Sequence, residues 1–398
     1  MNFTHAKTRQ RRGRVSRLEA TVVGFADLKR LPSQRRKEGC KKSILQVLFD
    51  FELLSLIKMN NLELTTNTIK KLQIGKRKVV EKLVNIEPLN SANPLPLIIY
   101  PAVDGVNLIS WMQQNRDFIE SNLLKNGGIL FRNFHVNTVE DFQNFVKVAS
   151  TGELLDYTYR STPRTEVSDK IYTSTEYPAD EAIPIHNENA YSPIYPMKIW
   201  FFCVKASEIG GETPIADSRK IFERLNPSIK ERFIEKKVMY VRNYGDLDLP
   251  WQEVFQTANK SEVESHCRKL GISFEWTGNN TLRTSQVCQA VAKHPKTGEI
   301  VWFNQAHLFH ISSLKAEVRE SLSALLKEDE FPRNAYYGDG SPIEVSILDE
   351  IREIYRQEVV IYPWEKGDVL MLDNMLAAHG RMPFVGKRKI VVAMAEPC

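Results

Sequence analysis

The chain has 398 residues and a mass of 45.8 kDa, which suits one large domain or two smaller ones. With 42% hydrophobic and 26% charged residues it can bury a full core. This composition excludes a mostly disordered chain, a collagen-like chain and a disulfide scaffold. Its five cysteines are scattered and form no CxxC pair. We therefore expect a reducing, cytoplasmic environment, with neither a zinc ribbon nor a redox dithiol.

The formal net charge of +5 is unevenly distributed along the chain. The first 50 residues are strongly basic and the remainder is mildly acidic, which argues against a nucleic-acid-binding protein. We treat residues 1–58 as a basic extension that is expected to be disordered. It is an over-extended reading frame, a tail that recruits an acidic partner, or an organelle transit peptide. No apolar run approaches the ~20 residues that cross a bilayer, so no membrane partner is expected.

Residues 59–398 are expected to form one domain, whose motifs lie within 95–398. In chain order, an apolar strand near residue 97 is followed by an amphipathic helix at 106–125, a strand beginning at Ile129 and a helix at 138–150. Short strands are then expected at 170–174, 197–204, 238–243, 288–293, 300–304, 357–362, 368–372 and 388–394. Further helices are expected at 217–235, 258–270, 314–327 and 345–357. This pattern is typical of a mainly β fold, a sandwich or barrel core with helical cover.

The most informative segment is 183–191, which reads IPIHNENAY. On a strand, residues i and i+2 face the same side, so His186 and Glu188 would direct an imidazole and a carboxylate to one point. Such a pair offers two ligands to a metal ion. An isolated H-x-E tripeptide is common and usually solvated. Asn187 and Asn189 would face away from the metal side and support it.

His379 is the candidate for a third ligand. It follows an apolar strand in the segment 367–394 and is expected in a glycine-flanked turn. Two histidines and one carboxylate on one face of an octahedron leave three positions open, which is typical of non-haem Fe(II) oxygenases. A tetrahedral zinc site would favour a third histidine or a cysteine. Taken alone, His379 is more often a buried histidine whose hydrogen bonds are satisfied.

Arg388 and Thr213 are the candidates for binding an anion. Arg388 opens the strand RKIVVAM and shares a face with Ile390 and Val392, where a guanidinium requires an anionic partner. Thr213 lies in GGETPIA, and its hydroxyl is placed to bond the same carboxylate. Taken singly, these are a strand-end arginine and a turn threonine.

Together these segments resemble the TauD/TfdA-type Fe(II)- and 2-oxoglutarate-dependent dioxygenases. The resemblance covers about residues 95–398 and rests on H-x-E, GGETP-x-AD and LDN…HGR-x-PF-x-G-x-R-x-x-VAM. The sequence is most similar to the amino-acid hydroxylase subgroup, which includes SyrP-like and clavaminate-synthase-like proteins. Taurine-type members carry Asp where this chain has Glu188. Arg388 also follows His379 more closely than the corresponding arginine does in some relatives.

The resemblance implies a double-stranded β-helix, or jelly-roll, core with helical cover. It implies Fe(II) bound by His186, Glu188 and His379, with 2-oxoglutarate and O₂ as co-substrates. Arg388 would clamp 2-oxoglutarate with Thr213 as its hydroxyl partner, and Arg381 is the alternative clamp. The implied reaction hydroxylates an aliphatic C–H bond and releases succinate and CO₂. Since halogenating members lack the carboxylate ligand, Glu188 favours hydroxylation or desaturation.

The expected substrate is a small amino-acid-like molecule, either free or attached to a carrier protein. Arg164, in the loop STPR, either binds a substrate carboxylate or is an ordinary exposed arginine. The segment VWFNQAHLFH contributes to the cavity through Trp302, Asn304 and His307, or forms a buried aromatic cluster; His294, His307 and His310 are not expected to be ligands. The alternatives are a taurine- or alkylsulfonate-type dioxygenase, a jelly-roll binding protein without oxidation, and an interaction protein that uses its basic arm.

Overall fold

The computed structural model describes residues 83–90, 93–155, 164–175, 177–245 and 247–398. The chain divides into two compact units, 1–71 and 72–398. The first unit, and with it the predicted basic extension 1–58, lies outside the described residues. Among the helices of the described segments, none is long and apolar enough to span a membrane.

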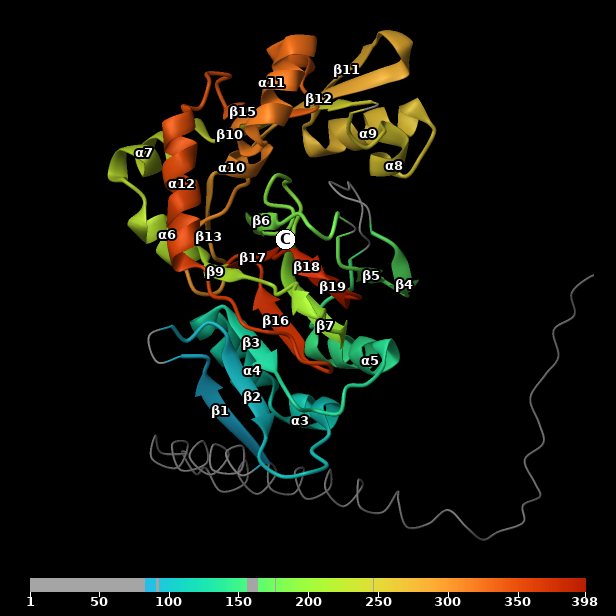
Figure 1. Cartoon of the computed structure of the whole chain (residues 1–398), viewed down its shortest axis with the longest axis vertical. Coiled ribbons are helices and arrows are strands. Elements are labelled where there is room, and N and C mark those ends of the chain that lie inside the picture. The colour runs from blue at the N-terminus through green and yellow to red at the C-terminus, as the bar shows by residue number, and fades with distance from the viewer. Residues whose placement is uncertain (1–82, 91–92, 156–163, 176, 246) are drawn as a thin grey trace, which may run out of the picture. The chain divides into compact units, whose positions relative to one another are not determined.

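A mixed sheet of eight strands forms the centre of the second unit (Figure 1). β2 and β3 run parallel, and the other neighbours in this sheet are antiparallel. In spatial order the strands are β1 (Val84–Pro88), β2 (Leu97–Pro101), β3 (Gly128–Phe131), β16 (Val369–Asp373), β7 (Pro196–Lys205), β19 (Lys389–Pro397), β5 (Ile171–Thr173) and β4 (Glu166–Ser168).

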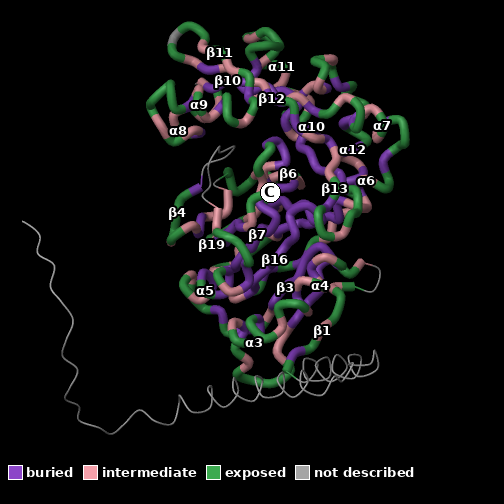
Figure 2. Tube along the Cα trace, turned by 180° about the vertical axis from the view of Figure 1, so that it is seen from behind, coloured by how far each residue is buried: buried purple, intermediate pink, exposed green. Residues whose placement is uncertain are grey.

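Helices cover one face of this sheet: α3 (Leu108–Gln114), α4 (Arg116–Asn126) and α5 (Val139–Ala149). Alternate residues of the central strands face them, because successive side chains of a strand point to opposite faces. Trp200 and Phe202 of β7 belong to this core, and Phe142 of α5 stacks on Phe202 with ring centroids 5.3 Å apart. Figure 2 shows the buried segments running through β3, β16 and β7.

Two smaller sheets lie beside the central one, and the first of them contributes to a second core on the opposite side of the central strands. The first contains β6 (Ile183–His186), β17 (Ala377–Arg381) and β9 (Ile215–Asp217), and the second pairs β18 (Phe384–Val385) with β8 (Ile209–Gly210). Ile199 and Phe201 of β7 pack here with Ile215 of β9 and Ala377 of β17. The three-stranded sheet is therefore held against the central one by buried apolar side chains.

The segment between β9 and β16 contains a separate antiparallel sheet and most of the helices. The sheet consists, in order, of β11 (Ser273–Thr277), β12 (Thr281–Cys288), β10 (Val238–Tyr244) and β15 (Arg333–Tyr337). A short pair joins β13 (Val291–Lys293) to β14 (Ile300–Trp302). The helices are α6 (Ser218–Arg224), α7 (Pro227–Lys236), α8 (Trp251–Phe255), α9 (Lys260–Leu270), α10 (Ala306–Phe309), α11 (Ala316–Leu325) and α12 (Val345–Glu358).

The fold is mixed α/β with several antiparallel sheets, and helices occupy about as much of the described chain as strands do. The helix expected at 138–150 is α5, which begins with a capping box between Thr138 and Asp141. The helix expected at 106–125 is two helices that meet at Asn115. The helix expected at 217–235 is also divided, because Pro227 cannot donate the backbone hydrogen bond that would continue α6.

One predicted strand is wrong, and several strands, β11 and β15 among them, were not predicted. The strand expected at 357–362 is instead the end of α12, followed by an isolated bridge between Val360 and Ile215. β11 and β15 were not expected. They pair with β12 and β10 in an antiparallel sheet whose hydrogen bonds join segments far apart in the chain.

Candidate active site

Two histidines face each other across neighbouring strands. His186 ends β6 and His379 lies in β17, and the antiparallel register pairs them directly. Their ring centroids are 4.7 Å apart. The expectation that His379 lies in a turn is therefore wrong. The adjacent Gly380 allows β17 to lie close to β6, since a Cβ there would lie 2.6 Å from the carbonyl oxygen of Ile183 in β6.

Glu188 completes a group of three candidate ligands. One donor atom from each of His186, Glu188 and His379 lies within 4.8 Å of the others. Glu188 sits in a turn after β6 rather than on the strand, so the predicted strand alternation does not account for its position. The turn is held by Asn374, whose side chain bonds both the backbone N–H and the carbonyl of Glu188. Asn374 is the last residue of the LDN motif, to which no individual role was assigned from the sequence.

His186 and Glu188 have the protonation states that a divalent metal ion requires. Burial, and then the nearby His379, lowers the pKa of His186 to about 4, so this ring is neutral at physiological pH. Burial alone would raise the pKa of Glu188. The Arg164 guanidinium and the two imidazoles outweigh burial, and this pKa is held well below its ordinary value.

The donor set fits iron. The Nδ1 of His186 lies 2.8 Å from the carbonyl oxygen of Pro184, to which it can only donate, so its Nε2 carries the free lone pair. The Nε2 of His379 lies 3.7 Å from Oε2 of Glu188, with Phe201 against the His379 ring at a centroid distance of 5.0 Å. Two imidazoles and one carboxylate at this spacing match the facial ligand set of non-haem Fe(II) enzymes.

Arg164 is buried, which excludes the exposed alternative. Its Nη2 lies 2.8 Å from Oε2 of Glu188, and both side chains are almost fully buried. Asn187, expected to support the site, is fully buried and donates to Ser218 and to the carbonyl of Asn374. Asn189 adopts a positive φ of 55° and accepts a hydrogen bond from Tyr191.

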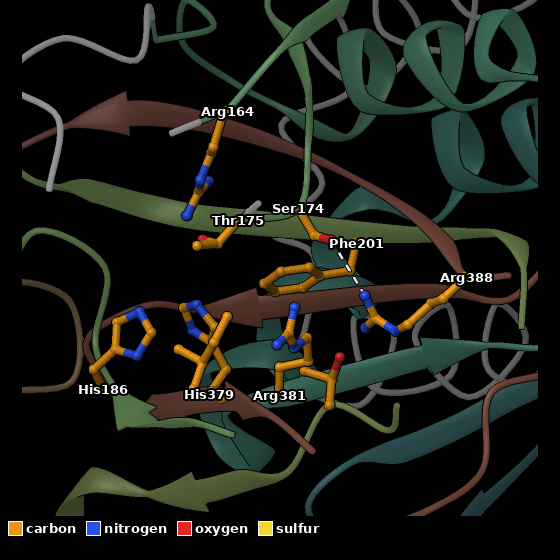
Figure 3. A pocket seen from close by; sticks show the side chains of 11 residues that line it. Arg164, Ser174, Thr175, His186, Phe201, His379, Arg381 and Arg388 are labelled. Carbon is orange, nitrogen blue, oxygen red and sulfur yellow. Dashed lines mark hydrogen bonds between the residues drawn. The ribbon is translucent and has the colours of Figure 1, made fainter. Parts of the chain in front are cut away.

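A cavity extends from the histidines to Arg388 (Figure 3). Figure 3 places His186 and Arg388 at opposite sides of the view, with Phe201 and Arg381 between them. Burial, followed by the neighbouring charge of Arg381, lowers the pKa of Arg388 to about 10. The full lining comprises Arg164, Ser174, Thr175, Ile183, His186, Phe201, Thr213, His379, Gly380, Arg381 and Arg388.

Backbone and hydroxyl groups orient the Arg388 guanidinium. Its Nε donates to the carbonyl of Gly211 at 2.8 Å, and its Nη1 donates to the Ser174 hydroxyl at 3.2 Å. Gly211 has a φ of 74°, and a Cβ there would lie 2.9 Å from Cδ of Arg388. This close approach explains the second glycine of the GGETP motif. Arg388 itself precedes β19, which begins at Lys389.

Thr213 keeps a hydroxyl hydrogen that it can donate, whereas both Nη groups of Arg381 already have hydrogen-bond acceptors. The Thr213 hydroxyl accepts a hydrogen bond from Nε1 of Trp364 at 3.1 Å, which leaves its own hydrogen to donate into the cavity. Arg381 uses its two Nη groups on the carbonyls of Tyr177, Pro178 and Glu181. These bonds fix the segment before β6, so Arg381 has a structural task that Arg388 lacks.

The remaining candidates lie outside the cavity lining. Trp302 is fully buried and packs edge-on against Phe233, as the aromatic-cluster alternative expects. Asn304 bonds the carbonyl of Ala290, and His307 bonds the carbonyl of Ile185. His294 and His310, like His307, are not in the group that could bind a metal ion.

Comparison with known proteins gives consistent matches over most of the chain. Residues 87–394 match the family described as "Taurine catabolism dioxygenase TauD, TfdA family". The dapdiamide synthesis protein DdaC of Enterobacter agglomerans is 40% identical over 314 residues, which is 79% of this chain and 94% of that protein. A clavaminate synthase-like protein of Arabidopsis thaliana is 30% identical over 323 residues, 78% of this chain and 92% of that protein. The solved structure of PvcB from Pseudomonas aeruginosa is 14% identical, with a TM-score of 0.47, over 79% of this chain and 92% of that one.

Proposed function

Because the chain belongs to the TauD/TfdA family of Fe(II)- and 2-oxoglutarate-dependent dioxygenases, we propose that it hydroxylates an aliphatic C–H bond of a small amino-acid-like molecule. Succinate and CO₂ are the products from 2-oxoglutarate. One observation carries this proposal: both histidines of a close His-x-Glu…His group line the same cavity as a buried, oriented arginine. A cavity built in this way suits a metal ion at one end and a dicarboxylate that reaches to the other.

In this proposal His186, Glu188 and His379 hold Fe(II). Iron, together with 2-oxoglutarate and O₂, supplies the oxidising chemistry. His186 presents its Nε2 because Nδ1 is bonded to Pro184, and Glu188 brings the single negative charge that offsets part of the metal's charge. Phe201 packs on the His379 ring and excludes water from that side. The chain thus supplies position, charge balance and a dry environment.

Arg388 is the proposed partner of the distal carboxylate of 2-oxoglutarate, with Thr213 as the hydroxyl donor. A buried guanidinium with a lowered pKa gains most from an anion, because the anion restores the stability of its charged form. The Nε and one Nη of Arg388 already have partners, and these bonds fix the direction of the remaining donors. Arg381 is the weaker candidate because three carbonyls occupy its Nη groups.

We also propose that the sheets around this cavity form a double-stranded β-helix, the core expected for the family. The central strands β3, β16, β7, β19 and β5 would be one wall, and β6, β17, β9 with β8 and β18 the other. The buried residues shared between these strands support this arrangement. Both candidate histidines project from the smaller wall.

The name of one relative and the position of Arg164 support the proposed substrate class. The name of DdaC refers to the synthesis of dapdiamide, which favours a biosynthetic substrate over the breakdown of taurine or an alkylsulfonate. Arg164 lines the cavity beside Glu188 and is our candidate for contact with a substrate carboxylate. The substrate is free or attached to a carrier protein. A binding protein without oxidation is not favoured, because the three candidate ligands are intact and close together.

The test is anaerobic reconstitution with Fe(II) and 2-oxoglutarate, followed by exposure to O₂ and a screen for succinate release. The screen covers free amino acids and amino acids loaded on a carrier protein. His186→Ala should abolish iron binding and turnover together, whereas His135→Ala, which removes an exposed histidine, should change neither. Substrate-dependent succinate formation by His186→Ala would contradict the assigned ligand role.

A further inference from the structure

Asn374 holds the backbone of Glu188 from both sides. The residue lies in the short connection between β16 and β17 and is fully buried. Its Oδ1 accepts from the backbone N–H of Glu188 at 2.7 Å, and its Nδ2 donates to the carbonyl of Glu188 at 2.9 Å. Both backbone polar groups of the candidate ligand are therefore bonded to one side chain.

The same asparagine makes three further hydrogen bonds, two to the start of β7 and one to Asn187. Nδ2 also donates to the carbonyl of Pro196 at 2.8 Å, and the backbone N–H donates to the carbonyl of Met197 at the start of β7. The carbonyl of Asn374 accepts from Nδ2 of Asn187, the residue before Glu188, at 2.7 Å. The Asn187 side chain thus bonds the backbone of Asn374, and the Asn374 side chain bonds the backbone of Glu188, so the two segments are joined in both directions.

The turn that contains Asn374 is rigid for a separate reason. Oδ1 of Asp373 accepts from the N–H groups of Met375 and Leu376 at 3.0 and 3.1 Å. Its Oδ2 lies 3.0 Å from Nε2 of His294, and both side chains are almost fully buried. β17, which carries His379, begins directly after this turn. The same buried turn therefore fixes the positions of both Glu188 and His379.

We propose that Asn374 is a positioning residue for the metal site, one that sets where the Glu188 carboxylate lies relative to His379. The reason is geometric. Glu188 lies in a turn after β6 and lacks the ladder hydrogen bonds that fix His186 and His379 in their strands. Asparagine suits the task because its side chain offers an acceptor and two donors in one plane. This inference rests on the proposed function only in that Glu188 is taken as a metal ligand.

The experiment measures Mn²⁺ affinity of the full-length protein, by titration followed through the signal of free Mn²⁺ in electron paramagnetic resonance. Asn374→Ala removes all three side-chain bonds, and Asn374→Asp keeps the volume and the acceptor but removes the donors. The matched control is Asn334→Ala in β15 of the separate sheet, which removes a buried asparagine that also bonds backbone N–H groups. All titrations run below the thermal midpoint of every variant, checked by circular dichroism.

Asn374→Ala is expected to weaken Mn²⁺ binding by about 10- to 100-fold, the usual cost of losing an outer partner of a metal ligand. Asn374→Asp should fall between it and the wild type, and Asn334→Ala should lose stability while keeping its Mn²⁺ affinity. Wild-type affinity in both Asn374 variants would overturn the proposal, and so would an equal loss in the control. If Asn374→Ala does not fold, the comparison of Asn374→Asp with Asn334→Ala decides.

Glu188→Ala separates this inference from the proposed function. If Glu188→Ala binds Mn²⁺ as the wild type does, Glu188 is not a ligand and the proposed metal site fails. If Glu188→Ala loses affinity while the Asn374 variants keep theirs, the metal site stands and the positioning role fails. Loss in both is the expected result.

Discussion

The arginine at the far end of the cavity gives the sharpest test of the proposed co-substrate site. Arg388→Met removes a buried guanidinium that two hydrogen bonds hold in place. Hydrogen bonds to charged groups contribute about 1.5–3 kcal/mol each, and every 1.4 kcal/mol changes affinity tenfold. If the side chain binds the distal carboxylate, 2-oxoglutarate should bind Arg388→Met about 10- to 150-fold more weakly than the wild type.

The assay is calorimetric titration of 2-oxoglutarate into the Mn²⁺-loaded protein without O₂. The same titration with 2-oxobutanoate, which lacks the distal carboxylate, measures the discrimination directly. The wild type should prefer 2-oxoglutarate by the factor given above, and Arg388→Met should lose most of that preference. Arg388→Lys should lie between them, because an ammonium keeps the charge but lacks the planar pair of donors.

Two results would contradict the assignment of Arg388 as the 2-oxoglutarate clamp. If Arg388→Met keeps the preference for 2-oxoglutarate and Arg381→Met loses it, the clamp is Arg381 and the three carbonyl bonds of Arg381 do not exclude it. If neither variant loses the preference, the distal carboxylate is not bound at this end of the cavity. Mn²⁺ affinity should stay unchanged in Arg388→Met, which separates loss of the clamp from loss of the metal site.

Three further changes have defined outcomes. Thr213→Val should weaken 2-oxoglutarate binding about fivefold, since a neutral hydrogen bond contributes about 1 kcal/mol, and the same titration checks this. Phe142→Ala, which removes a fully buried ring stacked on Phe202, should cost about 3–5 kcal/mol in the free energy of unfolding measured with urea. Burial raises the pKa of Asp248, but the hydrogen bond and charge of Arg333 outweigh it, so the folded-state pKa is lowered. The stability that Asp248 provides relative to Asp248→Asn is then complete above about pH 5 and should disappear as the pH falls through the folded-state pKa; a constant difference down to pH 2 would contradict the pairing.

The candidate ligands could be found from residue types and spacing, but their local structure could not. H-x-E and the later histidine offer two imidazoles and a carboxylate, and the structure brings His186, Glu188 and His379 together. The expected local structure was wrong for both residues. Glu188 lies in a turn and not on a strand, and His379 lies in a strand and not in a turn. Chemistry that depends on three side chains is visible in a sequence, whereas the pairing of β6 with β17 depends on contacts between distant segments.

The sequence contains weaker evidence for residues that act by hydrogen bonding to the backbone of other residues. Asn374 follows an apolar strand and precedes another, a place where asparagine is common in any turn. Its contacts with Glu188 appear only when β16, β17 and the turn after β6 are assembled. Arg164 gave an equally ambiguous signal, since a charged residue in a polar loop is usually exposed, and its burial depends on the carboxylate of Glu188 beside it.

The three-stranded sheet has a consequence for how the protein is made. Its strands come from either side of the long segment that contains β10, β11, β12 and β15, and β17 lies close to the C-terminus. A nascent chain that has emerged only as far as β15 offers an imidazole and a carboxylate but not the second imidazole. If His186, Glu188 and His379 hold the metal as proposed, loading must wait until synthesis is nearly complete, and a chain truncated before β17 should be released without the metal.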